Sequence, residues 1–179
     1  MRILPVILGL VLACSQSREA YAEPVTPCAA HEVAVVVNVS TRILSLCEQG
    51  KAQREFPVAL GIAGVGKRQQ GDHRTPLGAY PLGPPRPSSQ YGTFIPVGYP
   101  TPQQIAMGFT GTAVGIHGPP RANVNDGPRN TEVDWTWGCI AVGSDPEIQE
   151  IAAWLRKHPR TLVHILPAEE ASSHPSAAR

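Results

Sequence analysis

The most constraining feature of this sequence is a run of apolar residues at positions 33–39, Val-Ala-Val-Val-Val-Asn-Val. Its β-branched residues favour an extended backbone, and apolar residues occupy nearly every position instead of alternate ones. This pattern predicts a strand that is covered on both faces. Ser40-Thr41 then leads into a second apolar run at 43–47, so the two runs are predicted to form a hairpin.

Short apolar runs continue along the chain and are separated by turn residues. Gln49-Gly50-Lys51 forms a turn before the next run, in which Pro57 indicates an edge position or a bulge. The strands predicted after the hairpin are 55–60, 78–82, 112–117, 138–142 and 161–166. The sheet is therefore expected to consist of many brief strands joined by turns.

One helix is predicted, over 146–157. Pro146 suits a first helical turn, and Ser144 with Glu147 has the spacing of a capping box. Its apolar stripe consists of Ile148, Ile151, Ala152 and Leu155. An amphipathic helix of this kind packs its apolar side against a sheet.

The region 61–91 is rich in Gly, Pro and Arg and contains the loop 83–89. A long loop in a compact domain usually serves as a lid or a binding loop. The chain has 17 Gly and 19 Pro, which disfavours a bundle of long helices. The sequence therefore predicts a β-rich α+β domain, a twisted sheet or sandwich with one main helix and a long Gly/Pro-rich loop.

The N-terminus has the pattern of a targeting segment. Arg2 precedes an apolar stretch, 3–13, that is too short for a permanent membrane span. Ala20-Tyr21-Ala22 fits the small-x-small cleavage rule, which predicts a signal peptide over 1–22. Two alternatives are a lipoprotein that carries its lipid on Cys14 and an uncleaved membrane tether.

We therefore expect an exported protein of the periplasm or cell envelope, which contacts the membrane only through a signal or lipid anchor. The folded domain is predicted at 30–167 and is followed by a flexible tail at 168–179. The sequence does not specify an oligomeric state.

The charge balance argues against nucleic acid as a partner. Lys and Arg together number 15 against 14 Asp and Glu, a net charge of +1, which is too small to bind a phosphate backbone by counterion release. The Gly-rich run 61–67 imitates a phosphate-binding loop, but Arg68 replaces the Ser or Thr that would hold magnesium. The histidines lack zinc-ligand spacing, so no metal site is predicted.

Three cysteines lie outside the predicted signal peptide: Cys28, Cys47 and Cys139. In an oxidising compartment thiols tend to pair, and an odd number leaves one over. Cys28 and Cys47 flank the first hairpin and are candidates for a disulfide, although the sequence alone does not fix the connectivity. Cys139 would then be the free thiol.

Cys139 and His117 are the candidate catalytic pair. Gly138, directly before the thiol, allows a tight turn that can direct amide N–H groups toward the sulfur. His117 ends a predicted strand, where its ring can act as a general base toward the thiol. The alternative is that Cys139 is simply a small buried apolar residue.

Three segments of the sequence have the form of known motifs. Ile116-His117-Gly118 is a His-Gly motif, and Thr136-Trp137-Gly138-Cys139-Ile140 is a Gly-Cys motif. Upstream, Thr75-Pro76-Leu77-Gly78-Ala79-Tyr80 has the form Thr-Pro-x-Gly-x-aromatic. Together these segments resemble the L,D-transpeptidase catalytic domain family (YkuD-like), whose members remodel bacterial peptidoglycan. The resemblance extends from about residue 32 to 166 and implies the family's fold.

The sequence departs from the family pattern at two positions. Trp137 stands where a second histidine is usual, and Ala141 where Arg or Asn is usual, which indicates a divergent branch. The resemblance implies an oxyanion hole from the amides of Trp137, Gly138 and Cys139, which survives a side-chain change at Trp137. The two replaced side chains would have lined the pocket, so substrate orientation and acceptor choice stay open.

The resemblance implies an L,D-transpeptidase that acts on peptidoglycan stem peptides through a thioester on Cys139, with no cofactor. The carbonyl of Gly118 would accept the other ring N–H of His117 and fix its tautomer. Arg74 and Tyr91 are candidate substrate-binding residues. The alternatives are an L,D-carboxypeptidase or amidase that uses water as acceptor, and a catalytically inactive wall-binding module.

Overall fold

The structure is a computed structural model that describes residues 27–167. The predicted signal peptide, Cys14 and the predicted tail 168–179 lie outside the described residues. Within 27–167, no helix combines the length and the apolar character needed to cross a membrane.

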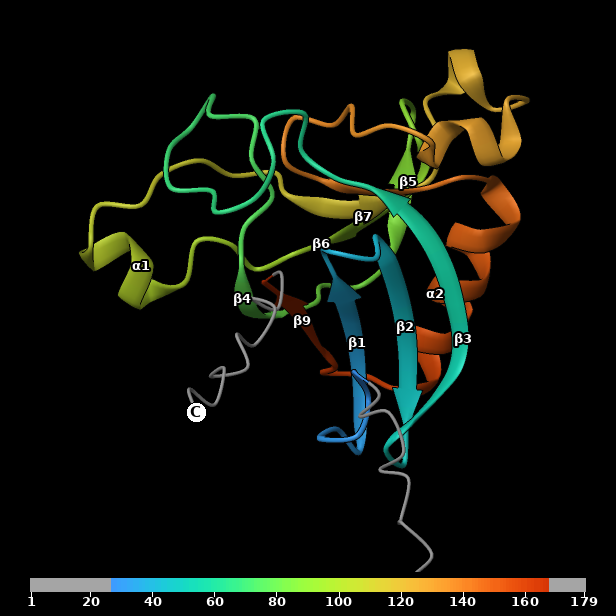
Figure 1. The fold of residues 1–179 in the computed structure, drawn as a ribbon, viewed down its shortest axis with the longest axis horizontal. Coiled ribbons are helices and arrows are strands. Elements are labelled where there is room, and N and C mark those ends of the chain that lie inside the picture. The colour runs from blue at the N-terminus through green and yellow to red at the C-terminus, as the bar shows by residue number, and fades with distance from the viewer. Residues whose placement is uncertain (1–26, 168–179) are drawn as a thin grey trace, which may run out of the picture.

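Nine strands form one sheet that curls on itself, with one main helix beside it (Figure 1). The strands are β1 (Val33–Asn38), β2 (Ile43–Glu48), β3 (Lys51–Ala59), β4 (Gly78–Pro81), β5 (Arg86–Ser88), β6 (Gly92–Pro96), β7 (Gly115–His117), β8 (Ile140–Val142) and β9 (Leu162–Leu166). The helices are α1 (Pro102–Ala106) and α2 (Asp145–Lys157), with 3₁₀ turns at Arg121–Asn123 and Gly127–Thr131. The predicted β-rich α+β class is confirmed.

The strand order is β4-β9-β1-β2-β3-β8-β7-β6-β5. Strand β3 belongs to both parts of the curled sheet, because it pairs with β2 along most of its length and with β8 at Val58 and Ala59. We call β4, β9, β1, β2 and β3 the first half-sheet, and β3, β8, β7, β6 and β5 the second half-sheet. Most neighbouring strands are antiparallel, but β1 with β9 and β7 with β8 are parallel.

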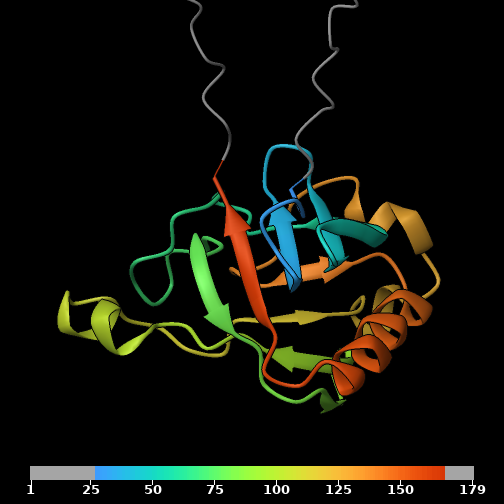
Figure 2. The same cartoon turned by 90° about the horizontal axis from the view of Figure 1, so that it is seen from below.

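One apolar core lies between the half-sheets and α2. Its members include Val35, Phe56, Ile95, Ile116, Ile140, Ile148, Ile151 and Val163, which come from both half-sheets and from the helix. Helix α2 packs against β6, where the Gln149 amide donates to the Thr93 hydroxyl at 2.7 Å. Figure 2 shows α2 at the opposite end of the molecule from the protruding segment that carries α1.

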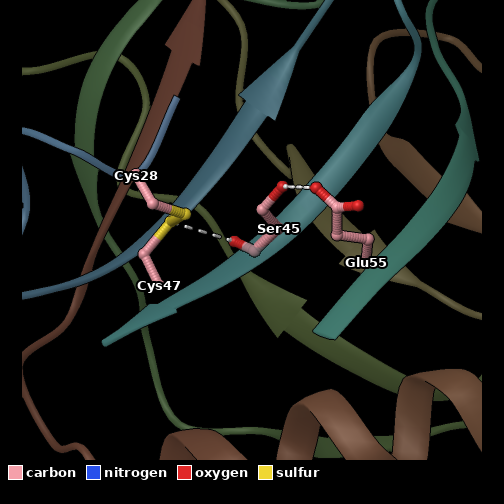
Figure 3. The surroundings of a disulfide bond; sticks show 4 residues. All are labelled: Cys28, Ser45, Cys47 and Glu55. Carbon is pink, nitrogen blue, oxygen red and sulfur yellow. Dashed lines mark hydrogen bonds between the residues drawn. A yellow bond between two sulfur atoms is a disulfide. The ribbon is translucent and has the colours of Figure 1, made fainter. Parts of the chain in front are cut away.

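Strand β1 is covered on both faces, as its sequence predicts. Val35 and Val37 belong to the main core, whereas Ala34 and Val36 belong to a second apolar cluster with Cys28 and Cys47. Cys28 and Cys47 form a disulfide, which is the pairing that the sequence left open. Figure 3 shows this disulfide beside β2. The bonded segment therefore supplies the outer cover of the first half-sheet.

Several elements differ from the sequence-based predictions. Strand β5 occupies part of the predicted loop 83–89, and β6 lies in a stretch for which no strand or helix was predicted. Helix α1 was not predicted, although Thr101 and Gln104 form a complete capping box there. At α2 the predicted capping box is absent: the Ser144 hydroxyl donates to the Glu147 carboxylate at 3.0 Å, and no Ser144 side-chain bond to the helix backbone is present.

Candidate active site

Two adjacent strands bring His117 and Cys139 together. Strand β7 ends at His117 and pairs in parallel with β8, with Ile116 opposite Ile140. Cys139 directly precedes β8, so the same register places it opposite Gly115, and directly paired residues project from the same face. Alternate residues of a strand share a face, so His117 lies on the same face as Gly115. The imidazole and the thiol therefore project from one face of the sheet, and both line a groove of about 910 Å³.

The protonation state of His117 follows from its surroundings. The side chain is fully buried, and its Nδ1 donates to the Gly118 carbonyl at 2.7 Å, as the family resemblance implies. This bond leaves Nε2 as the acceptor nitrogen, and within residues 27–167 Nε2 has no hydrogen-bond partner. Burial lowers the pKa of His117 to about 4. The ring is therefore a neutral base at neutral pH.

Aromatic side chains enclose the imidazole. The Tyr91 ring stacks on it, with centroids 3.7 Å apart and an interplanar angle of 17°. The rings of Trp135 and Phe94 lie 5.8 Å and 6.2 Å from it. These rings hold the imidazole in one orientation and exclude water from its faces. Tyr91, a candidate from the sequence, thus lines the groove directly over the proposed base.

Cys139 is a free, partly buried thiol. Its S–H donates to the Ala113 carbonyl, with the sulfur 3.5 Å from the oxygen. Burial raises the pKa of the Cys139 thiol, and the Gly115 hydrogen bond and the Lys67 charge oppose this rise only in part. The resting pair is therefore a neutral thiol beside a neutral imidazole, and the proton must move to His117 as the sulfur reacts.

Glycine is required before the cysteine. Gly138 has φ +114°, and a Cβ at this position would lie 2.6 Å from the Arg74 carbonyl oxygen. The Thr136 hydroxyl donates to the Cys139 carbonyl at 2.7 Å and accepts from the Gly138 amide at 3.1 Å. The Gly138 N–H is therefore engaged within the loop, unlike in the oxyanion hole expected from the sequence.

The Thr-Pro segment supports this loop from the other side. Thr75 is fully buried, and its hydroxyl donates to the Cys139 carbonyl at 3.4 Å and accepts from the Gly61 amide at 2.8 Å. Two separate hydroxyl groups thus hold the carbonyl of the candidate nucleophile. This explains why threonines occur both in the Thr-Pro segment and three residues before Cys139.

Trp137 and Arg74 occupy different places relative to the groove. Trp137 is 77% exposed, lines the groove and stacks on His73, with centroids 5.1 Å apart and an angle of 17°. The Arg74 side chain is not among the groove residues, because its guanidinium extends to the Val65 carbonyl at 3.3 Å. The predicted substrate contact of Arg74 therefore has no support in this geometry.

The groove residues that sequence reasoning missed include Lys67, Arg86 and Trp135. The Lys67 side chain is buried, and its ammonium pairs with Asp72 at 2.8 Å. The five-residue spacing of these opposite charges in a Gly-rich loop was a signal for this pair. Trp135 donates to the Asn130 carbonyl at 2.8 Å, and its place in the Asp-Trp-Thr string was its only signal.

Within residues 27–167, no group of three or more His, Cys, Asp or Glu side chains is arranged to hold a metal ion. The groove itself contains a thiol, Cys139, and an imidazole, His117, beside backbone amides. Together these groups can form and break an acyl bond to sulfur.

The match to known proteins agrees with the fold. Residues 32–165 match the YkuD family, the L,D-transpeptidase catalytic domain, and the chain belongs to this family. No curated protein sequence matches the chain.

Solved structures of three bacterial proteins are similar. Pgp2, the helical cell shape determining protein of Campylobacter jejuni, is 28% identical with a TM-score of 0.62, over 77% of this chain and 48% of Pgp2. Bd1075 of Bdellovibrio bacteriovorus is 22% identical with a TM-score of 0.55, over 76% of this chain and 48% of Bd1075. An L,D-transpeptidase from Mycobacterium smegmatis is 15% identical with a TM-score of 0.48, over 76% and 59% of the two chains. This chain therefore aligns with about half the length of Pgp2 and Bd1075.

Proposed function

We propose that this chain is an exported, cysteine-dependent L,D-transpeptidase that acts on peptidoglycan stem peptides in cell-wall remodelling. The observation that carries the proposal is the placement of Cys139 and His117 on one face of the sheet, in one groove, with the His117 tautomer fixed by Gly118. Membership of the L,D-transpeptidase catalytic domain family supports the reaction class.

In the first half-reaction, the Cys139 sulfur attacks the carbonyl carbon of the bond between an L-centre and a D-centre. The thiol proton passes to His117 Nε2, the acceptor nitrogen, which bonds to no other group among residues 27–167. The Trp137 and Cys139 amides are the proposed donors to the developing oxyanion, since the Gly138 amide is engaged by Thr136. The C–N bond then breaks, His117 returns the proton to the leaving amine, and a thioester forms.

In the second half-reaction, an acceptor nucleophile attacks the thioester carbonyl. His117 removes a proton from the acceptor and returns it to the sulfur as the C–S bond breaks. An amine acceptor yields a cross-link between stem peptides. The low pKa of His117, about 4, keeps the ring able to accept this proton at neutral pH.

A second candidate is an L,D-carboxypeptidase or amidase with water as the acceptor. The observation that favours it is Trp137, an exposed indole at the groove. An indole donates one hydrogen bond and accepts none, so it cannot bind or deprotonate an incoming amine through a lone pair. A water molecule is small and can be deprotonated by His117 without a second side chain to bind it.

Two observations support the proposed location and role. The Cys28–Cys47 disulfide is typical of oxidising compartments outside the cytoplasm. Pgp2, which resembles this chain, is described as a determinant of helical cell shape, and a related role in the wall is proposed here.

Product analysis with purified stem tetrapeptides tests the proposal. Mass spectrometry should detect cross-linked dimers when a peptide with an acceptor amine is present, and Cys139→Ala should form none. Shortened monomers alone would replace the transpeptidase with the water-dependent enzyme. Neither product from folded wild-type protein would contradict catalysis and favour a wall-binding module.

A further inference from the structure

Arg86 lies in register with the proposed base across three strands. Arg86 of β5 pairs with Phe94 of β6, and Phe94 pairs with His117 of β7. Residues directly paired across strands project from the same face of a sheet. All three line the groove. Arg86 thus stands two strands from the imidazole, on the side away from β8, the strand that begins just after Cys139.

Phe94 holds the guanidinium in this position. The Arg86 Cζ lies 5.1 Å from the centre of the Phe94 ring, within the range of a cation–π interaction. The Phe94 ring is in turn nearly parallel to the His117 ring, at 12°. One row of stacked groups therefore carries both the base and the cation, and little side-chain entropy is lost when Arg86 binds a ligand.

The charge of Arg86 is uncompensated. Arg42, Arg54 and Arg121 each pair with a carboxylate. Across residues 27–167, by contrast, no carboxylate pairs with Arg86, and no Asp or Glu lines the groove. The other groove cation, Lys67, is neutralised by Asp72. Arg86 is thus the groove cation with its charge available to a ligand.

We propose that Arg86 is a specificity-determining residue that binds a free carboxylate of the stem peptide. This inference rests on the proposed function for the identity of the peptide. Strand β8 begins just after Cys139 and is three strand spacings from β5, which amounts to about 14 Å. An extended peptide spans about 3.3 Å per residue, so the carboxylate lies within about four residues of the scissile carbonyl. A planar guanidinium binds a carboxylate through two parallel hydrogen bonds, which a neutral amide cannot match.

The test measures binding separately from turnover. In the full-length Cys139→Ala protein, calorimetry gives the Kd of a stem tetrapeptide with free carboxylates and of two amidated versions. One version is amidated on the acyl-donor side of the scissile bond, and the other on the leaving D-residue. In the wild-type background, kcat/KM is measured with the same peptides.

Arg86→Gln should weaken binding of the free-carboxylate peptide about 10- to 100-fold, the range for a lost charge-assisted hydrogen bond. Arg86→Lys should fall between wild type and Arg86→Gln. For one of the two amidated peptides, the Kd should be the same with Arg86 and with Arg86→Gln in the Cys139→Ala protein. The group that is amidated in this peptide is then the carboxylate that Arg86 binds. The matched control is Arg68→Gln: Arg68 also covers an aromatic ring, Phe109, at 5.4 Å but does not line the groove, so its Kd should be unchanged.

The possible failures are distinguishable. If Arg86→Gln leaves the Kd of every peptide unchanged in the Cys139→Ala protein, the role of Arg86 is overturned. This holds whether or not the wild-type protein turns over the peptides. Arg86-dependent binding without turnover in the wild-type protein would uphold this inference and overturn the proposed reaction. Absence of both binding and turnover would overturn both.

Discussion

The two half-sheets are built for different tasks. The first half-sheet has strands of four to nine residues, and β1 buries apolar side chains on both faces beneath a disulfide. Beyond the shared β3, the second half-sheet has strands of three to five residues. One of them carries the buried His117, whose Nε2 has no hydrogen-bond partner in the described part of the chain.

A buried polar atom without a hydrogen bond costs about 1–3 kcal/mol of folding free energy. The second half-sheet tolerates this cost at His117 Nε2, where a proton acceptor is useful for chemistry. The first half-sheet supplies apolar burial and a covalent cross-link. The contrast teaches that stability and reactivity are separated along the curled sheet, and variants in each half should therefore affect different measurements.

The largest effect on activity is expected from Cys139→Ala. Loss of the sulfur removes the nucleophile, so turnover of stem peptides should fall to the uncatalysed background. The free energy of unfolding should change by less than about 1 kcal/mol, since only one partly buried sulfur is removed. Product formation and urea unfolding measured on the same preparation check both parts. Residual turnover above that background would contradict the assignment.

His117→Gln should reduce kcat/KM by about 10²- to 10⁴-fold, because a general base contributes about this much to proton transfer. Glutamine is nearly isosteric with one edge of the ring but cannot accept the thiol proton at neutral pH. Stopped assays with the tetrapeptide substrate measure the loss. A change of less than threefold would show that another group activates the sulfur.

Removing the disulfide should lower the unfolding free energy and leave the activity unchanged, which is the opposite of the effect expected for the catalytic variants. The double variant Cys28→Ser with Cys47→Ser should lose about 3 kcal/mol of unfolding free energy, because the bond closes a loop between residues 19 apart in sequence. At a temperature where the variant stays folded, its kcat should match wild type. A large loss of kcat in the folded variant would show that the two half-sheets are not separate.

A smaller effect should appear in the pH dependence of stability. The folded-state pKa of His117, about 4, lies below its unfolded value of 6.5, so the unfolded chain binds more protons between these values. The stabilisation is fully present above about pH 6.5 and is lost as the pH falls toward 4. At pH 4.5 the loss should be about 2–3 kcal/mol.

His117→Gln should abolish this part of the slope, while His164, whose pKa is also lowered, acts in both proteins and cancels in the difference. Urea unfolding of both proteins at pH 7.5 and 4.5 gives the comparison. Identical slopes would mean that His117 is not buried in its neutral form.

The sequence predicted the parts of the molecule that local patterns specify. The apolar run of β1, the stripe of α2 and the Gly-Cys and His-Gly motifs each depend on neighbouring residues. Strands β5 and β6 escaped prediction because three to five residues among Gly and Pro show no clear alternation. Their pairing depends on β7, which is distant in sequence.

The reactive residues of the site could be predicted from the sequence, but the positions of the residues around them could not. Cys139 and His117 could be singled out from their motifs, but the burial of Lys67 requires its contact with Asp72. The place of Arg74 could not be foreseen, because its carbonyl packs against Gly138 and its side chain leaves the groove. The register that aligns Arg86 with His117 exists only once β6 lies between them.

The decisive measurement is the intact mass of the protein quenched during turnover of a stem tetrapeptide, followed by peptide mapping. The mass should increase by that of the peptide minus its terminal D-amino acid, and the adduct should map to Cys139 as a hydroxylamine-sensitive thioester. The adduct should be absent from Cys139→Ala. An adduct on any other residue, or turnover by Cys139→Ala at the wild-type rate, would contradict the role of Cys139 as the nucleophile.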